Sequence, residues 1–315
     1  MTVEVEERIH AALKSHPLER TEDGYRMVHA QGSGVSSLRL LPVRIEGSTV
    51  VATAEITAQY NPVGLPAFHA PGVQRLNSMA VHGAYDLRNG QLHQTAQVAV
   101  RADEPRVHFV VQTILNAFGA QLPIGRSTAL MIVSPEVQEQ QRAHHAMPRD
   151  WTRAVDQADL EATTAALRER GLPAANDANR VWAELALSGD CPSRAIDPQA
   201  ETALLQAHAG VVHPIAGTGY LATISLPYAA PPADAALITA RLNALEFEQV
   251  DFVPRLGAWG LHSAGDTPGY SCFIPSAEPQ DGLALTMIWW CALRAAWLRD
   301  RVWTAKQGIV FTEHT

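Results

Sequence analysis

The sequence predicts an α+β fold made of two related units in tandem. Each unit is expected to be an antiparallel sheet with helices, in the order helix, three strands, helix, hairpin, helix. The chain has 315 residues, which is enough for two ordinary domains that each bury a core. Its composition, 47% apolar and 18% charged, is that of a folded protein. A short motif also recurs at the same place in a repeated order of elements.

The expected boundaries follow from a polar segment near the middle of the chain. Residues 135–149 are polar and carry almost no apolar stripe, which is typical of a connector. We therefore expect a first unit over residues 1–134 and a second over residues 150–315.

The first unit is expected to open with a helix. Val5, Ile9 and Leu13 recur at helical spacing, and Pro17 ends the pattern. Short β-prone runs follow, separated by turn-forming residues. These runs predict three antiparallel strands, over Tyr25–Ala30, Ser37–Ile45 and Thr49–Ile56.

A short helix and a hairpin are expected next. The helix runs from Pro71 to Met79, after a proline-rich connector. Asn89-Gly90 then supplies the two positive-φ residues that a type I′ hairpin turn requires. The strands on either side of this turn are expected over Val81–Leu87 and Leu92–Val100.

An apolar helix is expected to close the first unit. It begins after Pro105, and its apolar residues from Val107 to Phe118 follow the i, i+3, i+4 pattern. Gly119 is placed to end it.

The second unit is expected to repeat this order with one exception. Asp197–Ala209 reads as a helix with Asp197 as its N-cap, at a place where the repeat requires a strand. The other expected elements are a helix ending at Arg170-Gly171, strands over Val181–Leu187 and Tyr220–Leu226, a helix over Pro232–Glu246, strands over Leu256–His262 and Tyr270–Ile274, and a helix over Leu283–Trp303.

The recurring motif is Arg-Leu-Asn, at Arg75-Leu76-Asn77 and again at Arg241-Leu242-Asn243. Each copy follows a strand with an Ala-Thr pair, Ala52-Thr53 or Ala222-Thr223, and each precedes two strands and an apolar helix. Because the motif keeps its place in this order, we interpret the chain as a duplication whose halves pack as a pseudo-dimer.

The order of elements, with Leu76-Asn77 and Leu242-Asn243, resembles the type III secretion chaperone-like fold, which includes the YbjN-like sensory-regulator proteins. The resemblance covers residues 3–120 and, less completely, 150–303, and the helix expected at Asp197–Ala209 departs from it. It implies a protein-binding or chaperone role without a catalytic centre, and it transfers no binding residue.

Charge and hydropathy argue against nucleic acid and membrane partners. The formal net charge is −8, and no segment concentrates Lys and Arg as phosphate binding requires. The N-terminal segment carries acids where an export signal carries bases. The most apolar stretch, Leu283–Trp303, is interrupted by Arg294, Arg299, Asp300 and Arg301. We therefore expect a cytoplasmic protein.

No cofactor and no metal site are expected. His144-His145 are adjacent, so on a helix they point in different directions, and no zinc-binding spacing occurs elsewhere. Cys191, Cys272 and Cys291 form no CxxC pair, which suits a reducing compartment and buried thiols.

The final helix carries the candidate interface residues Met287, Trp290, Arg294 and Trp297 on one apolar arc. Two interpretations stay open. In a core helix, Arg294 would pair with a carboxylate or with backbone carbonyls. In an interface between the two halves or between two chains, Trp and Arg would anchor the contact.

The sequence thus predicts a non-catalytic protein-binding or chaperone-like module, whose partner is another protein or a second copy of the chain. The alternative is a small-molecule enzyme or ligand-binding protein that uses a cleft between the halves. Convergent buried ionisable groups in such a cleft would favour the enzyme, whereas an exposed apolar patch without them would favour binding.

Overall fold

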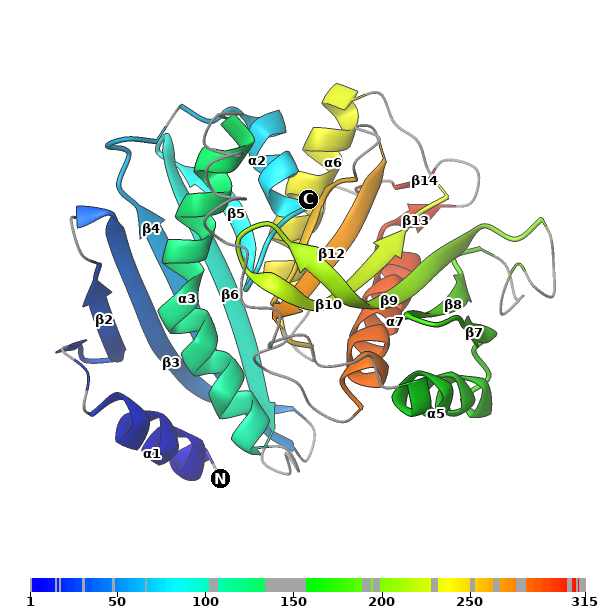
Figure 1. Cartoon of the computed structure of the whole chain (residues 1–315), viewed down its shortest axis with the longest axis horizontal. Helices are drawn as coiled ribbons and strands as arrows, with labels where there is room; N and C mark the ends of the chain where they lie inside the picture. Colours follow the sequence, from blue (N-terminus) through cyan, green and yellow to red (C-terminus); the bar gives the residue numbers. More distant parts are fainter. Residues whose placement is uncertain are drawn as a thin grey trace.

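The computed structural model contains two six-stranded antiparallel sheets, each with a long helix packed along it (Figure 1). This confirms the α+β class and is consistent with two similar units. The structure describes residues 2–14, 16, 18–29, 32–46, 49–65, 67–101, 107–133, 157–188, 194, 199–227, 232–249, 253–262, 267–275, 282–304, 308–309 and 311. The connector expected at residues 135–149, with His144-His145, and Cys191 lie outside the described residues.

The first unit has the expected order of elements, with one additional short strand, β1, after the opening helix. Its opening helix packs against the closing helix of the same unit, and its apolar side chains Val5, Ile9 and Leu13 are buried. The elements are α1 (Thr2–Leu13), β1 (Glu19–Arg20), β2 (Gly24–Val28), β3 (Gly34–Glu46), β4 (Thr49–Tyr60), α2 (Ala70–Asn77), β5 (Ala84–Arg88), β6 (Gln91–Arg101) and α3 (Val107–Val133).

The hairpin between β5 and β6 is confirmed. Asn89 has φ 53° and Gly90 has φ 76°, as a type I′ turn requires. Arg88 lies opposite Gln91 on either side of this turn, which fixes the register of the two strands.

Helix α3 is longer than expected. Instead of ending at Gly119, it continues through Pro123 to Val133. Glycine opposes a helix by only about 1 kcal/mol, whereas an interior proline costs about 3 kcal/mol. Leu122 and Met131, on the continuing helix, are buried, so packing against the sheet outweighs both local penalties.

The second unit follows the same plan and ends with a small extra hairpin. The short strands β7, β13 and β14, like β1 in the first unit, were not expected from the sequence. The elements are α5 (Gln157–Glu169), β7 (Ala174–Asn176), β8 (Arg180–Ala186), β9 (Thr202–His213), β10 (Gly217–Ser225), α6 (Pro232–Gln249), β11 (Ala258–Leu261), β12 (Pro268–Pro275), α7 (Leu283–Arg301), β13 (Trp303–Thr304) and β14 (Gly308–Ile309).

The helix expected over Asp197–Ala209 is wrong. Most of this segment belongs to strand β9, in which Ala203, Leu205, Ala207 and Ala209 are buried and alternate with less buried residues. This period of two marks a half-buried strand. The favourable helix propensity of Ala, Leu and Gln is therefore overridden by pairing with β8 and β10.

With β9 as a strand, the repeat is complete. The strand orders are β1-β2-β3-β4-β6-β5 and, in the same sense, β7-β8-β9-β10-β12-β11. Ala84 pairs with Thr95 where β5 begins, and Ala258 pairs with Ser271 where β11 begins. These pairs relate the two units residue by residue.

The same register corrects one part of the repeat seen in the sequence. In β4, Thr57 is the partner of Thr95, and in β10, Thr223 is the partner of Ser271. Thr57 is therefore the equivalent of Thr223, and the match of Ala52-Thr53 with the later Ala-Thr pair was wrong.

The two units are joined by backbone bridges at equivalent residues, one antiparallel and one parallel. Arg255, just before β11, pairs with Gln97 of β6, while Val81, just before β5, pairs with Phe273 of β12. Helix α2 packs on α6 and on β11. Figure 1 shows α2 and α6 next to each other at the top of the molecule. One hydrophobic cluster contains side chains from both units, so the halves share a core.

Candidate functional site

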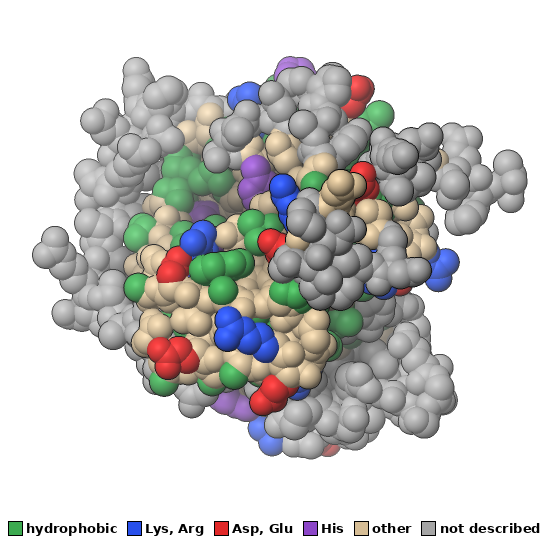
Figure 2. Space-filling view, turned by 90° about the vertical axis from the view of Figure 1, so that its right-hand side faces the viewer, with side chains coloured by type: hydrophobic (Ala, Val, Ile, Leu, Met, Phe, Trp, Pro, Cys, Tyr) green, Lys and Arg blue, Asp and Glu red, His purple; other side chains and the backbone are tan. Residues whose placement is uncertain are grey.

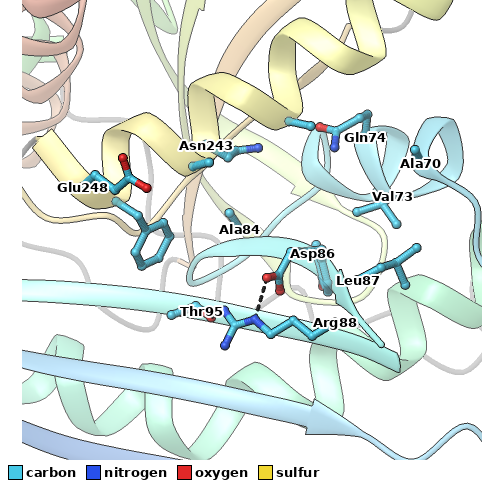
Figure 3. A pocket seen from close by; sticks show the side chains of 14 residues that line it. Ala70, Val73, Gln74, Ala84, Asp86, Leu87, Arg88, Thr95, Asn243 and Glu248 are labelled. Atoms are coloured by element: carbon cyan, nitrogen blue, oxygen red, sulfur yellow. Dashed lines mark hydrogen bonds and ion pairs between the residues drawn. The ribbon is translucent and has the colours of Figure 1, made fainter. Parts of the chain in front are cut away.

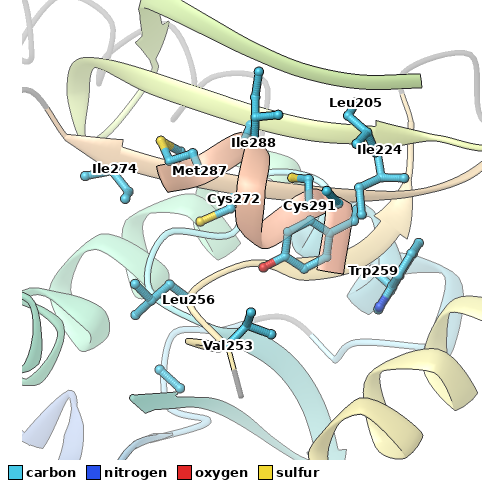
Figure 4. Packing of buried hydrophobic residues seen from close by; sticks show 14 of the residues in the cluster. Leu205, Ile224, Val253, Leu256, Trp259, Cys272, Ile274, Met287, Ile288 and Cys291 are labelled. Atoms are coloured by element: carbon cyan, nitrogen blue, oxygen red, sulfur yellow. The ribbon is translucent and has the colours of Figure 1, made fainter. Parts of the chain in front are cut away.

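The candidate interface residues of the C-terminal helix lie mainly in the core of the second unit. Met287, Arg294 and Trp297 of α7 are buried, and Trp290 is partly buried. Figure 4 shows Met287 among apolar side chains of the second sheet.

Arg294 has the partners that the core interpretation requires. Its Nε donates to the carboxylate of Glu246 at 2.7 Å, and its guanidinium also donates to the carbonyls of Pro254 and Trp290. The guanidinium carbon lies 4.4 Å from the ring centre of Tyr270. The guanidinium of Arg294 therefore has its ion-pair and hydrogen-bond partners inside the protein.

Helix α7 packs on α5 and on β8, β9 and β10 of its own unit. The larger contacts between the two units run through α2, α6 and β11 instead. Contact of α7 with a second chain stays a prediction.

A cleft of about 510 Å³ lies at the junction of the units (Figure 3). Helix α2 and strand β5 of the first unit line one side, and helix α6 of the second unit lines the other. Its apolar lining includes Val73, Leu87 and Phe247. None of these residues was singled out from the sequence as a site residue.

The two walls differ in kind. On α6 the lining residues Ala240, Asn243, Ala244, Phe247 and Glu248 fall at the spacing of one helix face. On β5 the lining residues are consecutive, Ala84 to Arg88. Because consecutive residues of a strand point to opposite faces, the cleft runs along the edge of β5 and not over one face of the sheet.

The repeat explains why this cleft opens beside β5. By the register above, Asp86 of β5 is the equivalent of Gly260 of β11. A Cβ at position 260 would lie 2.5 Å from the Ser78 nitrogen and 2.8 Å from the Gln74 carbonyl oxygen. The missing side chain therefore lets α2 pack directly on β11, whereas β5 carries Asp86 at this place and leaves a cleft before α6.

The charged groups of the cleft are partly exposed. Arg88 Nε contacts Asp86 Oδ2 at 2.7 Å, and Arg88 Nη2 donates to Thr95 Oγ1 at 3.1 Å, so these two charges balance each other (Figure 3). Glu248 is exposed and forms no ion pair within the part of the chain that the structure describes. The open face of α6 thus presents this carboxylate at the cleft.

Buried polar side chains lie between the first sheet and α3. The Tyr60 hydroxyl donates to Gln94 Oε1 at 2.5 Å and to the Gln121 carbonyl at 3.1 Å. Burial raises the pKa of Tyr60 and of Tyr85, whose ring centres lie 6.2 Å apart, so both hydroxyls stay protonated at neutral pH. These groups hold the sheet to the helix and do not supply a base.

One buried histidine joins the two units. His213 Nε2 donates to the Met79 carbonyl at 3.0 Å, and its Nδ1 accepts the Ala216 N–H at 2.9 Å. Burial lowers the pKa of His213 to about 4, so the ring is neutral at physiological pH and both nitrogens are engaged.

Other kinds of site find little support in the described residues. They contain no group of three or more His, Cys, Asp or Glu side chains placed to hold a metal ion. None of their helices is both long and apolar enough to cross a membrane. On the face that Figure 2 shows, acidic and basic side chains are interspersed and neither sign forms a continuous patch.

Burial raises the pKa of the Cys291 thiol, so this cysteine stays protonated and unreactive. Cys272 is buried as well.

Comparison with known proteins gives no assignment. No family model matches the chain, and no curated protein and no solved structure matches it significantly. The functional argument therefore depends on the cleft itself.

Proposed function

We propose that this protein is a non-catalytic protein-binding module, and that a partner protein docks in the cleft between β5 and α6. The observation that carries the proposal is the composition of this cleft. Apolar side chains line it, and its two opposite charges, Asp86 and Arg88, neutralise each other at 2.7 Å. The remaining acid, Glu248, is exposed.

This lining lacks the arrangement that catalysis requires. The charged residues that line the cleft are Asp86, Arg88 and Glu248, and Tyr85 also lines it but its hydroxyl is buried. No Ser, Cys, Lys or His is among the lining residues, and the hydroxyl of the one lining threonine, Thr95, accepts from Arg88 and is not paired with a base. Exposed apolar surface without converging buried charges favours binding over chemistry.

A chaperone-like role is part of the same proposal. It is supported by the duplicated unit, because the resemblance to type III secretion chaperone-like proteins rests on that order of elements. Two such units packed through α2 and α6 create a surface that neither unit has alone.

The proposal can be tested with a photo-crosslinking amino acid placed in the cleft. We would replace exposed Ala244, on the open face of α6, and use exposed Leu237 of the same helix as the control position. Irradiation of the cells that make the protein should give a crosslinked protein from position 244 and not from position 237. Equal crosslinking at both positions, or none at either, would contradict the proposal.

A small-molecule ligand is the second candidate, and the size of the cleft favours it. A volume of about 510 Å³ lies within the range of small-molecule sites. Native mass spectrometry of the purified protein should then show a bound mass below 1 kDa, roughly the limit for such ligands. The mass should disappear in Ala244→Trp and persist in Leu237→Trp.

A further inference from the structure

We infer that the occupant of the cleft is an extended peptide segment that pairs, as an added strand, with the outer edge of β5 at Leu87. This inference rests on the proposed function and specifies the partner's chemistry. Strand addition to a sheet edge is a general mode of peptide recognition, in which backbone hydrogen bonds supply affinity and side-chain pockets supply selectivity.

The strand register shows which backbone groups face the cleft. In a type I′ hairpin the residues flanking the turn, here Arg88 and Gln91, exchange backbone hydrogen bonds. Pairs alternate along an antiparallel ladder, so the N–H and C=O groups of Tyr85 and Leu87 point away from β6. Since β5 is the last strand of its sheet, these groups face outward at an edge.

The outward-facing backbone groups of Tyr85, two residues before Leu87 on the same edge, already bind a side chain of the protein. The Tyr85 N–H donates to Asn77 Oδ1 at 2.7 Å, and Asn77 Nδ2 donates to the Tyr85 carbonyl at 3.2 Å. The carboxamide of Asn77 thus occupies the place of a peptide group in a neighbouring strand. Leu87 is the next outward-facing residue, and it lies in the cleft.

The opposite wall leaves room for a main chain. Ala240 and Ala244 are the small residues of the α6 face, while Val73 and Phe247 offer apolar contacts to side chains that alternate along an extended peptide. The exposed carboxylate of Glu248 at the cleft adds a preference for Lys or Arg at one peptide position. The cleft is also continuous with the contact between α2 and α6, which belongs to the established junction of the units.

The equivalent edge in the second unit is occupied. Asn243 binds the backbone of Trp259 as Asn77 binds Tyr85, but there α2 packs directly on β11 at Gly260. The cleft beside β5 has no counterpart there among the described residues, and we expect one bound peptide per chain.

The test uses a phage-displayed library of random heptapeptides selected on the full chain. Enriched peptides should alternate apolar residues and include a Lys or Arg. A labelled synthetic copy should bind Ala244→Trp at least about tenfold more weakly than the parent protein, because the indole fills the cleft. Leu237→Trp, two turns away on the same exposed face of α6 and outside the lining of the cleft, should change affinity less than about twofold.

Two readouts address the strand pairing itself. N-methylation of the peptide amide that faces Leu87 should weaken binding by about tenfold, since it removes a backbone donor. Bound peptide should also slow hydrogen exchange of the Leu87 amide.

The possible failures are distinct. If Ala244→Trp abolishes binding but every N-methylated peptide binds normally, strand addition is wrong and the cleft remains the binding site. If no peptide is enriched, or enriched peptides ignore Ala244→Trp, the peptide inference is overturned. The crosslinking at position 244 then decides the proposed function independently.

Discussion

Asn77 of α2 and Asn243 of α6 make the same pair of hydrogen bonds in the two units. Asn77 bonds both backbone groups of Tyr85, at 2.7 and 3.2 Å. Asn243 bonds both backbone groups of Trp259, each at 2.8 Å. Asn77 therefore links α2 to the edge strand β5, and Asn243 links α6 to the edge strand β11. The preceding leucines, Leu76 and Leu242, are fully buried.

This relationship predicts that the asparagines contribute strongly to stability. Asn77→Ala leaves two buried backbone groups of Tyr85 without partners, and we expect a loss of about 2–4 kcal/mol in the free energy of unfolding, measured in urea. Asn243 is partly exposed, so Asn243→Ala should cost less. Asn116→Ala, which removes a side-chain pair with Gln112 on the surface of α3, is the control and should cost less than about 1 kcal/mol.

Local pattern was enough to predict much of the fold. The hairpin at Asn89-Gly90 requires two consecutive residues with positive φ, and Asn-Gly is a pair that adopts this conformation readily. This turn can therefore be predicted from the two residues alone. Strand β9 was missed because alanines supply most of its buried face, and small side chains give a weak alternating signal. This segment is a strand because it pairs with β8 and β10, and such long-range pairing is not visible in the local sequence.

The cleft could not be predicted for a related reason. The cleft exists because Asp86 of β5 faces α6, whereas its equivalent in β11, Gly260, lets α2 approach closely. Both contacts join residues that are far apart in the sequence. The Arg-Leu-Asn motif did mark the right helices, α2 and α6. It gave no sign that the surface between them would be open on one side.

The tight contact at Gly260 gives a second prediction. Gly260→Ala places a Cβ against the backbone at Gln74 and Ser78, so α2 must shift from β11. We expect a destabilisation of about 1–3 kcal/mol, the usual cost of overpacking, measured as the free energy of unfolding. Gly119→Ala in α3, where an added Cβ meets nothing within 4 Å, should be neutral or stabilising by up to about 1 kcal/mol. Similar values for both variants would contradict the packing of α2 on β11.

The buried ion pair of Arg294 and Glu246 gives a third. Glu246→Gln leaves the Arg294 charge buried without its carboxylate, and we expect a loss of about 3–5 kcal/mol in urea unfolding. Asp300→Asn, beside Arg299 on the surface of the same helix, should cost less than about 1 kcal/mol. In the double variant Glu246→Gln with Arg294→Met the buried charge is absent, so much of the loss should be recovered. A double variant as unstable as the single one would show that the charge is not the cause.

The last prediction concerns acid and the junction of the units. Burial lowers the pKa of His213 to about 4, below its ordinary value of 6.5, so the unfolded chain takes up a proton at a higher pH than the folded chain. The contribution of the neutral ring is therefore complete above pH 6.5 and is lost as the pH falls from there towards 4. For this one ring the loss of stability has an upper limit of about 3 kcal/mol.

His82, also buried and with its pKa lowered to about 4, adds a loss of stability in the same direction. His213→Gln should reduce the slope of stability against pH in this window. Because His213 donates to the Met79 carbonyl at the end of α2, protonation of both nitrogens would also break the contact that its Nδ1 accepts from Ala216. A stability profile of His213→Gln parallel to that of the parent chain between pH 7 and pH 4 would show that this ring does not titrate with unfolding.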